Sequence, residues 1–427
     1  MLFQITRNIS TTLYVGVLFL SYMWLYITYF YRHRAITRAI VPSPMASLFL
    51  LSLVWIPFVS LAHMEMGDYL IAFPRYFVTF PFILFCFLYR EYRYELIKQV
   101  FRIICVFIAV SALSVPYQIA FGRVSFFAEP GYREGLERYA SLAGSLTALG
   151  TLGVLSLALL LFAGDILFTK NKKILLITIT VLGTLMTLQK AAVANTAICF
   201  AAYILIGGNG RLIKRSLAAI GLCLLVYGAY SVFRGSQFAL YIDSIVRYSF
   251  SGSSVGMKQD LMQRAFKFPL ATIRYFDMRF LDFISGIGFP SLAGTVGLPK
   301  FPMAHNNYFD LLLSGGVLHL VSYLVLMVRI PLKVVRKRLR GMKISSIDSS
   351  YSMVVILFLI NMLIGAATFY QPIATVVIFV TICSYDAVTR EVSLSMRRSL
   401  SRQQETPVDG CSIQPEATGQ GLGRSEG

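Results

Sequence analysis

Residues 301–327, FPMAHNNYFDLLLSGGVLHLVSYLVLM, join the end of a polar segment to an apolar run of membrane-spanning length. A helix needs about 20 apolar residues to cross a bilayer, and the run at 308–328 meets that requirement. His305, Asn306 and Asn307 stand directly before it. The stretch therefore sets a titratable imidazole and two amides at the start of a predicted membrane helix.

The rest of the chain repeats this apolar pattern. Hydrophobic residues make up 56% of the 427 residues, charged residues only 14%, and the mean hydropathy is +0.68; soluble proteins carry about 25% charged residues. The sequence predicts an all-α polytopic membrane protein with about 11 (10–12) transmembrane helices. The predicted spans are 11–30, 46–62, 69–89, 103–121, 139–163, 174–188, 191–206, 216–233, 308–328, 351–368 and 373–387.

The basic residues orient these spans. By the positive-inside rule, 25 of the 39 Lys and Arg residues fall in predicted cytoplasmic segments, so the net charge of +19 does not indicate a nucleic-acid partner. Helices one to eight then occupy 1–233, and one large outer loop spans 234–305. Helices nine to eleven follow at 306–389, and residues 390–427 have the polar composition of a disordered cytoplasmic tail.

The outer loop combines cationic side chains with a candidate base. Arg247, Lys258 and Arg264 suit a polyanionic headgroup such as a lipid-linked diphosphate, or the loop simply contacts anionic lipid headgroups. His305, with an ordinary pKa near 6.5, suits a general base that deprotonates a hydroxyl, with Asn306 beside it to position the substrate or the ring. The alternative is an interfacial histidine with ordinary polar contacts. The four histidines are too scattered to predict a metal site, and no cofactor is expected.

Several stretches resemble the superfamily of O-antigen polymerases and O-antigen ligases. His305-Asn306, nine residues and then Gly316 match the ligase motif, which ends in Gly, Thr or Tyr where this chain has His319. A Gly-rich turn, GIGF at 286–289, precedes the motif. KQDLMQRAF at 258–266 is similar to an Arg-x-x-x-Trp-x-x-Ala-Leu segment, with Lys and Met at its two key positions. TLQK, ending at Lys190, is similar to Thr-x-Ser-Arg, and Arg138 opens a stretch similar to the start of the family's middle span.

The resemblance implies a bacterial inner-membrane enzyme with a periplasmic active site. It would polymerise oligosaccharide repeat units carried on undecaprenyl diphosphate, without a metal, using His305 as base. Arg138, Lys190, Lys258, Arg264 and Arg247 would bind the diphosphate and glycan together with Asn306. Expected partners are membrane lipids, a chain-length regulator and a flippase of the same pathway. The departures at 190, 258 and 319 leave polymerase and ligase both open, and a lipid-linked sugar transporter or flippase is the alternative from another class.

His319 is a separate case within the motif. It follows His305 by 14 positions, which is about 21 Å along a regular helix. Such a distance is too long for a shared site. The sequence thus predicts that His319→Gly, which restores the residue common in the family, retains polymerisation.

Overall fold

The computed structural model describes most of the chain outside the outer loop. The described residues are 11–33, 43–77, 79–89, 92–124, 127, 131–133, 136–144, 148–187, 189–205, 268–277, 279–289, 306–342, 344–364 and 372–405, with 221, 231, 243 and 266 alone. They are mostly helical. The exception is a short antiparallel hairpin of β1 (Gly131–Arg133) and β2 (Leu136–Arg138), in which Gly131 pairs with Arg138.

Within the described residues, six helices are long and apolar enough to cross a membrane. Their segments are Pro44–His63 in α3, Tyr94–Phe121 in α6, Ala148–Leu167 in α7, Asn307–Leu339 in α16, Ser346–Leu363 in α17 (Ser346–Ile364) and Ile373–Leu394 in α18 (Pro372–Glu405). This confirms a helical membrane protein. The other helices are α2 (Thr11–His33), α4 (Met66–Phe77), α5 (Phe80–Leu88), α8 (Lys170–Leu185), α9 (Lys190–Leu205), α13 (Phe268–Phe276) and α14 (Phe280–Ser285).

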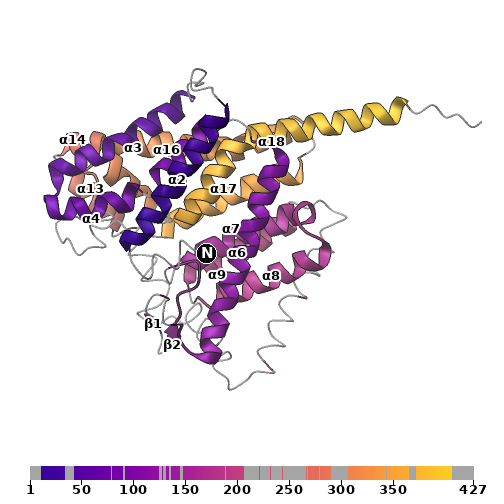
Figure 1. Ribbon diagram of the computed structural model, residues 1–427, viewed down its shortest axis with the longest axis horizontal. Helices are drawn as coiled ribbons and strands as arrows, with labels where there is room; N and C mark the ends of the chain where they lie inside the picture. The colour runs from indigo at the N-terminus through magenta and orange to yellow at the C-terminus, as the bar shows by residue number, and fades with distance from the viewer. Residues whose placement is uncertain are drawn as a thin grey trace, which may run out of the picture.

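Helix α7 is the most enclosed of the candidate spans, because it packs against α6, α8, α9 and α17. Small residues bring these helices close together, as is usual where helices pack in lipid. An added Cβ at Gly183 of α8 would lie 2.4 Å from the Cβ of Ala112 on α6, and one at Gly153 of α7 would lie 2.0 Å from Oγ1 of Thr184 on α8. Figure 1 shows α6, α7, α8 and α9 grouped on one side of the molecule.

Helix α16 joins that group to the remaining helices, because it packs against α17 on one side and against α3 and α14 on the other. His319 of α16 is fully buried at the contact with α3, where its ring stacks on Phe49 at 5.3 Å and its Nδ1 lies 2.7 Å from Oγ of Ser52. Helix α18 packs against α17, α5 and α6 and then runs on past the bundle (Figure 1).

Two predicted spans differ from the observed helices, and a third lies almost entirely outside the described residues. The span at 69–89 is two helices, α4 and α5, with Pro74 inside the first and Pro81 in the first turn of the second. The span at 139–163 begins as a helix only at Ala148, because residues 139–144 form a buried turn. The span at 216–233 falls almost entirely outside the described residues, as does most of the loop at 234–305.

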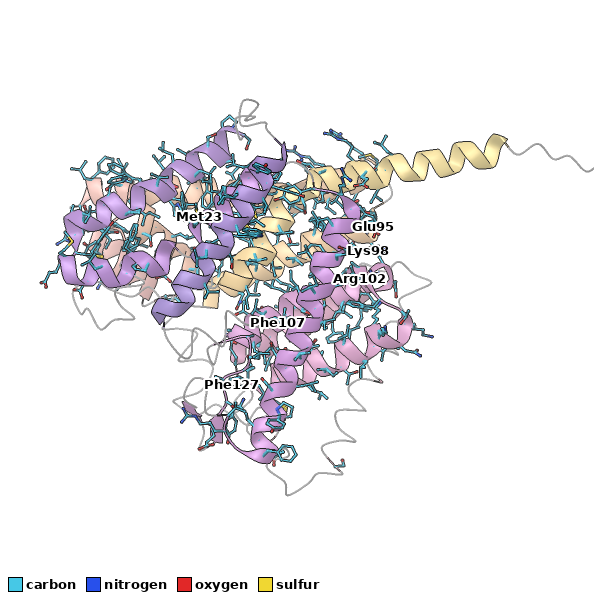
Figure 2. All side chains as sticks on the ribbon, in the orientation of Figure 1. Met23, Glu95, Lys98, Arg102, Phe107 and Phe127 are labelled. Atoms are coloured by element: carbon cyan, nitrogen blue, oxygen red, sulfur yellow. The ribbon has the colours of Figure 1, made fainter. Side chains whose placement is uncertain are left out.

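The two ends of the bundle differ in chemistry. One end, which we call the basic end, carries Lys98, Arg102, Lys333 and Lys337, and Lys337 pairs there with Asp348 at 2.7 Å. Figure 2 shows Glu95, Lys98 and Arg102 close to one end of α6, with Phe107 farther along the helix and Phe127 beside its other half. Arg138, Lys190 and Asn306, the described residues among those predicted to form the site, belong to the opposite end.

Candidate functional site

The start of α16 is tied to the end of α17. Asn306 caps α16: its side-chain oxygen accepts from the backbone N–H of Tyr308 at 3.1 Å, and its side-chain nitrogen donates to the carbonyl of Leu363 at 3.2 Å. The hydroxyl of Tyr308 donates to the carbonyl of Leu359 at 2.8 Å. His305, which directly precedes the capping residue in the sequence, lies outside the described residues.

Two further contacts bring the starts of α7 and α9 to this same end. Asn361, near the end of α17, donates to Oγ1 of Thr151 in the first turn of α7 at 2.8 Å. Beside it, an added Cβ at Gly150 would lie 1.7 Å from Oε1 of Gln189 and 3.1 Å from the Cβ of Ala192. The turn between α8 and α9 therefore lies against the start of α7. Lys190 is the first residue of α9 and belongs to this end, although its side chain is not among those described.

A buried turn at 139–144 brings in the end of α6. Gln118 of α6 donates to the carbonyl of Ala140 at 2.8 Å, and Ser114 accepts from the backbone N–H of Leu142 at 3.2 Å. These polar groups of α6 explain why the segment is not helical, since they satisfy its backbone groups inside the bundle. Arg138, the last residue of β2, leads directly into this turn, and its side chain also falls outside those described.

Arg138, Lys190 and Asn306, which lie far apart in the sequence, are therefore brought by the fold to one end of the bundle. His305, Lys258, Arg264 and Arg247 lie outside the described residues, so their roles stay predictions. Both polar ends of the Asn306 side chain are occupied by contacts within the protein. Its contact with a substrate stays a prediction, and the observed geometry shows that it fixes the start of α16 against the end of α17.

The glycines singled out in the sequence contact each other. Gly316 (φ 75°, ψ −175°) interrupts α16, so the regular helix expected between His305 and His319 is wrong. The turn at 286–289 fills the interruption: Ile287 and Gly288 donate to the carbonyls of Leu313 and Ser314 at 2.6 and 3.1 Å. The turn satisfies backbone carbonyls that the broken helix leaves open inside a membrane span.

Polar side chains inside the spans are the site residues that the sequence analysis missed. Gln118, Thr151, Asn195 and Asn361 are all buried. Polar groups within apolar spans are energetically unfavourable and usually have a functional or packing role. Their presence in the predicted spans was therefore the sequence signal that could have identified them. Their partners on other helices could not be read from it.

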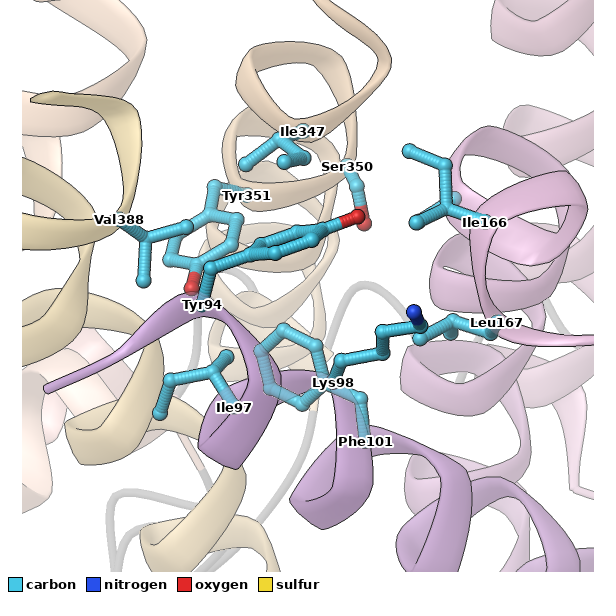
Figure 3. A pocket seen from close by; sticks show the side chains of 11 residues that line it. Tyr94, Ile97, Lys98, Phe101, Ile166, Leu167, Ile347, Ser350, Tyr351 and Val388 are labelled. Atoms are coloured by element: carbon cyan, nitrogen blue, oxygen red, sulfur yellow. The ribbon is translucent and has the colours of Figure 1, made fainter. Parts of the chain in front are cut away.

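A small pocket at the basic end lies apart from this site (Figure 3). It lies among α6, α7, α17 and α18, and most of its lining is apolar: Tyr94, Ile97, Lys98, Phe101, Ala163, Ile166, Leu167, Ile347, Ser350, Tyr351 and Val388. Because Ile347 and Ser350 belong to the first turns of α17, the pocket lies at the end opposite Asn361. It is not a candidate for the predicted chemistry.

The described part of the chain holds no group of three or more His, Cys, Asp or Glu residues that could bind a metal ion. A scan against models of known protein families gives no match for this chain. A search of curated proteins gives none either.

Proposed function

We propose that this protein is a glycosyltransferase of the bacterial inner membrane that polymerises repeat units carried on undecaprenyl diphosphate. The observation that carries the proposal is the convergence of the chain at Arg138, Lys190 and Asn306 on one end of a helical bundle. Two of these residues are cationic and the third fixes the start of α16 beside His305. A general base next to cations is the arrangement that glycosyl transfer from a diphosphate needs.

The proposed reaction uses these groups as follows. His305 takes the proton of an acceptor hydroxyl on one lipid-linked unit, and the oxygen attacks the anomeric carbon of another. The bond from that carbon to the diphosphate oxygen breaks, and undecaprenyl diphosphate leaves with the electron pair. The negative charge on the leaving group is stabilised by Arg138, Lys190, Lys258 and Arg264, and Arg247 is a further candidate for this role. In this scheme the cations do the work that a metal ion does in other transferases.

The proposal includes a topology. Eleven spans would leave residues 234–305 and the Asn306 end in the periplasm, with the basic end in the cytoplasm. The cations gathered at the basic end, Lys98, Arg102, Lys333 and Lys337, agree with that orientation, since Lys and Arg are enriched on the cytoplasmic side. A ligase that transfers the glycan to lipid A-core is the same chemistry with another acceptor, so the two are separated by supplying each acceptor to the purified protein.

The test uses purified protein in nanodiscs, given only lipid-linked repeat units. Wild type should lengthen them without nucleotide sugar or ATP, and a chelator should make no difference. His305→Ala should lower turnover by about 10²–10⁴-fold, the range for loss of a general base. His63→Ala is the matched control, because His63 ends α3 on the Asn306 side and its described partners are Asp282, at 3.5 Å, and the carbonyl of Val59, at 3.0 Å.

A transporter gives no product in this closed system, whichever residue is changed. The assignment of His305 is wrong if His305→Ala matches wild type, and the whole proposal is wrong if wild type leaves a verified substrate unchanged with either acceptor.

A further inference from the structure

The α8–α9 hairpin buries polar side chains for which the described part of the protein supplies no hydrogen-bond partner. They are Oγ1 of Thr180, Thr184 and Thr196, Oε1 of Gln189 and both amide atoms of Asn195. The three threonines and Asn195 are each at most 6% exposed. We call these five residues the hairpin polar cluster. A buried polar group without a partner is unfavourable, so a concentration of them in one hairpin requires an explanation.

The cluster faces the start of α7. Thr184 lies against Gly153 and Gln189 against Gly150, as the positions of added Cβ atoms show. Ala192 of α9 also lies at Gly150, and both helices run away from this end of the bundle. Asn195 and Thr196 follow Ala192 by one helical turn, as Gly153 follows Gly150. They therefore lie at about the depth of Thr184, beside the glycine face of α7.

We propose that the α8–α9 hairpin moves away from α7 and that the hairpin polar cluster then binds the hydroxyl groups of a glycan. This inference rests on the proposed function and extends it, because it assigns the uncharged glycan to the hairpin polar cluster and leaves the diphosphate to the cationic residues. The hairpin polar cluster supports movement, because Thr184 and Gln189 lie against Gly153 and Gly150 of α7, which offer no side-chain hydrogen-bonding group, so these polar groups gain partners only on separation.

The chemistry of the cluster selects the ligand. Threonine hydroxyls and the side-chain amides of Asn and Gln both donate and accept hydrogen bonds and carry no charge. They match sugar hydroxyls, which also donate and accept, and they lack the positive charge that a diphosphate needs. Lys190, which follows Gln189 in the sequence, is the residue that the proposed function assigns to the diphosphate. The hairpin would thus contact the glycan through the hairpin polar cluster and the diphosphate through Lys190.

Cysteine labelling tests the movement. Asn195→Cys is treated in membranes with a charged methanethiosulfonate reagent, and Cys199 is the internal control. Cys199 is fully buried on the same face of α9 one turn deeper. The introduced thiol should react at least about tenfold faster than Cys199, as local opening of the hairpin predicts. Thr184→Cys provides a second position if the first variant does not fold. Equal protection of the introduced thiol and Cys199 at both positions overturns the proposal.

Ligand protection tests the second half. A lipid diphosphate carrying the glycan should slow labelling of the introduced cysteine, whereas undecaprenyl diphosphate without a glycan should leave the rate unchanged. Equal protection by both lipids assigns the cluster to the diphosphate or the lipid and overturns the glycan assignment. Absence of protection by either overturns it as well.

A cross-link separates this inference from the proposed function. In the pair Gly153→Cys with Thr184→Cys, the Cβ atoms would lie about 3.2 Å apart, close to the separation that a disulfide needs. Oxidation should lower lengthening of lipid-linked units at least about tenfold relative to the same variant kept reduced, and reduction should return it to that reference level. Full activity of the cross-linked protein refutes the movement. If wild type lengthens nothing, the proposed function fails, while the labelling and protection rates still decide this inference.

Discussion

Gly316→Ala is the sharpest test of the interrupted α16. Gly316 has φ 75° and ψ −175°, a region that only glycine occupies readily. An added Cβ would lie 1.9 Å from the carbonyl oxygen of Ile284 and 2.8 Å from the backbone nitrogen of Gly286. These are backbone atoms, so no side-chain rotation can relieve the overlap. The turn at 286–289 must move away from α16.

The magnitude follows from what that movement breaks. The backbone strain itself costs about 1–3 kcal/mol. Displacing the turn also breaks the two buried hydrogen bonds from Ile287 and Gly288, each worth about 1–3 kcal/mol when its groups are left unpaired. Gly122 is a matched control: it has nearly the same conformation, φ 91° and ψ 172°, and nothing within 4 Å of an added Cβ. Gly122→Ala measures the strain alone, so Gly316→Ala should be less stable than it by about 2–6 kcal/mol.

The free energy of unfolding is measured by titrating purified protein in mixed micelles with sodium dodecyl sulfate and following helicity. The comparison needs only the difference between the two variants, so errors common to both extrapolations cancel. If Gly316→Ala proves no less stable than Gly122→Ala, the turn does not hold the broken helix, and the account of both glycine motifs is wrong.

Asn306→Asp keeps the side-chain oxygen that caps α16 but removes the amide that donates to α17, whereas Asn306→Ala removes both groups. We expect the free energy of unfolding of the alanine variant to be lower than that of the aspartate variant by about 0.5–2 kcal/mol, measured in the same titration. His319→Gly should lower the free energy of unfolding by about 2–5 kcal/mol, because it leaves a cavity at the buried contact with Phe49. The folded fraction of this variant should lengthen substrate at the wild-type rate, and a loss of turnover in that fraction would give His319 a role in catalysis. Reporter fusions at Gly252 and Gly341 should report opposite compartments, and the same compartment for both would overturn the topology and with it the site.

Hydropathy predicted the hairpin of α8 and α9 well, and the reason is physical. Two apolar runs at 174–188 and 191–206 are separated by a polar tip, and the observed helices are Lys170–Leu185 and Lys190–Leu205. Length and apolar composition determine such spans, and both are local properties of the sequence. The turn at 139–144 was missed because its backbone partners, Ser114 and Gln118, belong to another helix.

The break in α16 was missed for a related reason. The apolar run at 308–328 is continuous through Gly316, and a single glycine inside a helix is commonly tolerated. The turn at 286–289 stabilises the break, because its backbone N–H groups donate hydrogen bonds to the carbonyls of Leu313 and Ser314. Because that turn lies in a separate part of the sequence, only the tertiary structure reveals the pairing. In the sequence, the turn at 286–289 and Gly316 are two separate points of resemblance to a family, whereas in the structure they are the two sides of one contact.

Asn306 shows how far the candidate site could be read from the sequence. Its place beside His305 predicted a contact with the substrate or the imidazole, and the observed side chain instead caps α16 and holds it to Leu363. A residue directly before a capped helix start has no freedom to slide along the helix, since the cap defines where the helix begins. The asparagine therefore fixes the start of α16, and its role in positioning the adjacent His305 stays a prediction. That gives a reason for the two residues to be adjacent, because moving either by one position would detach the proposed base from the contact between α16 and α17.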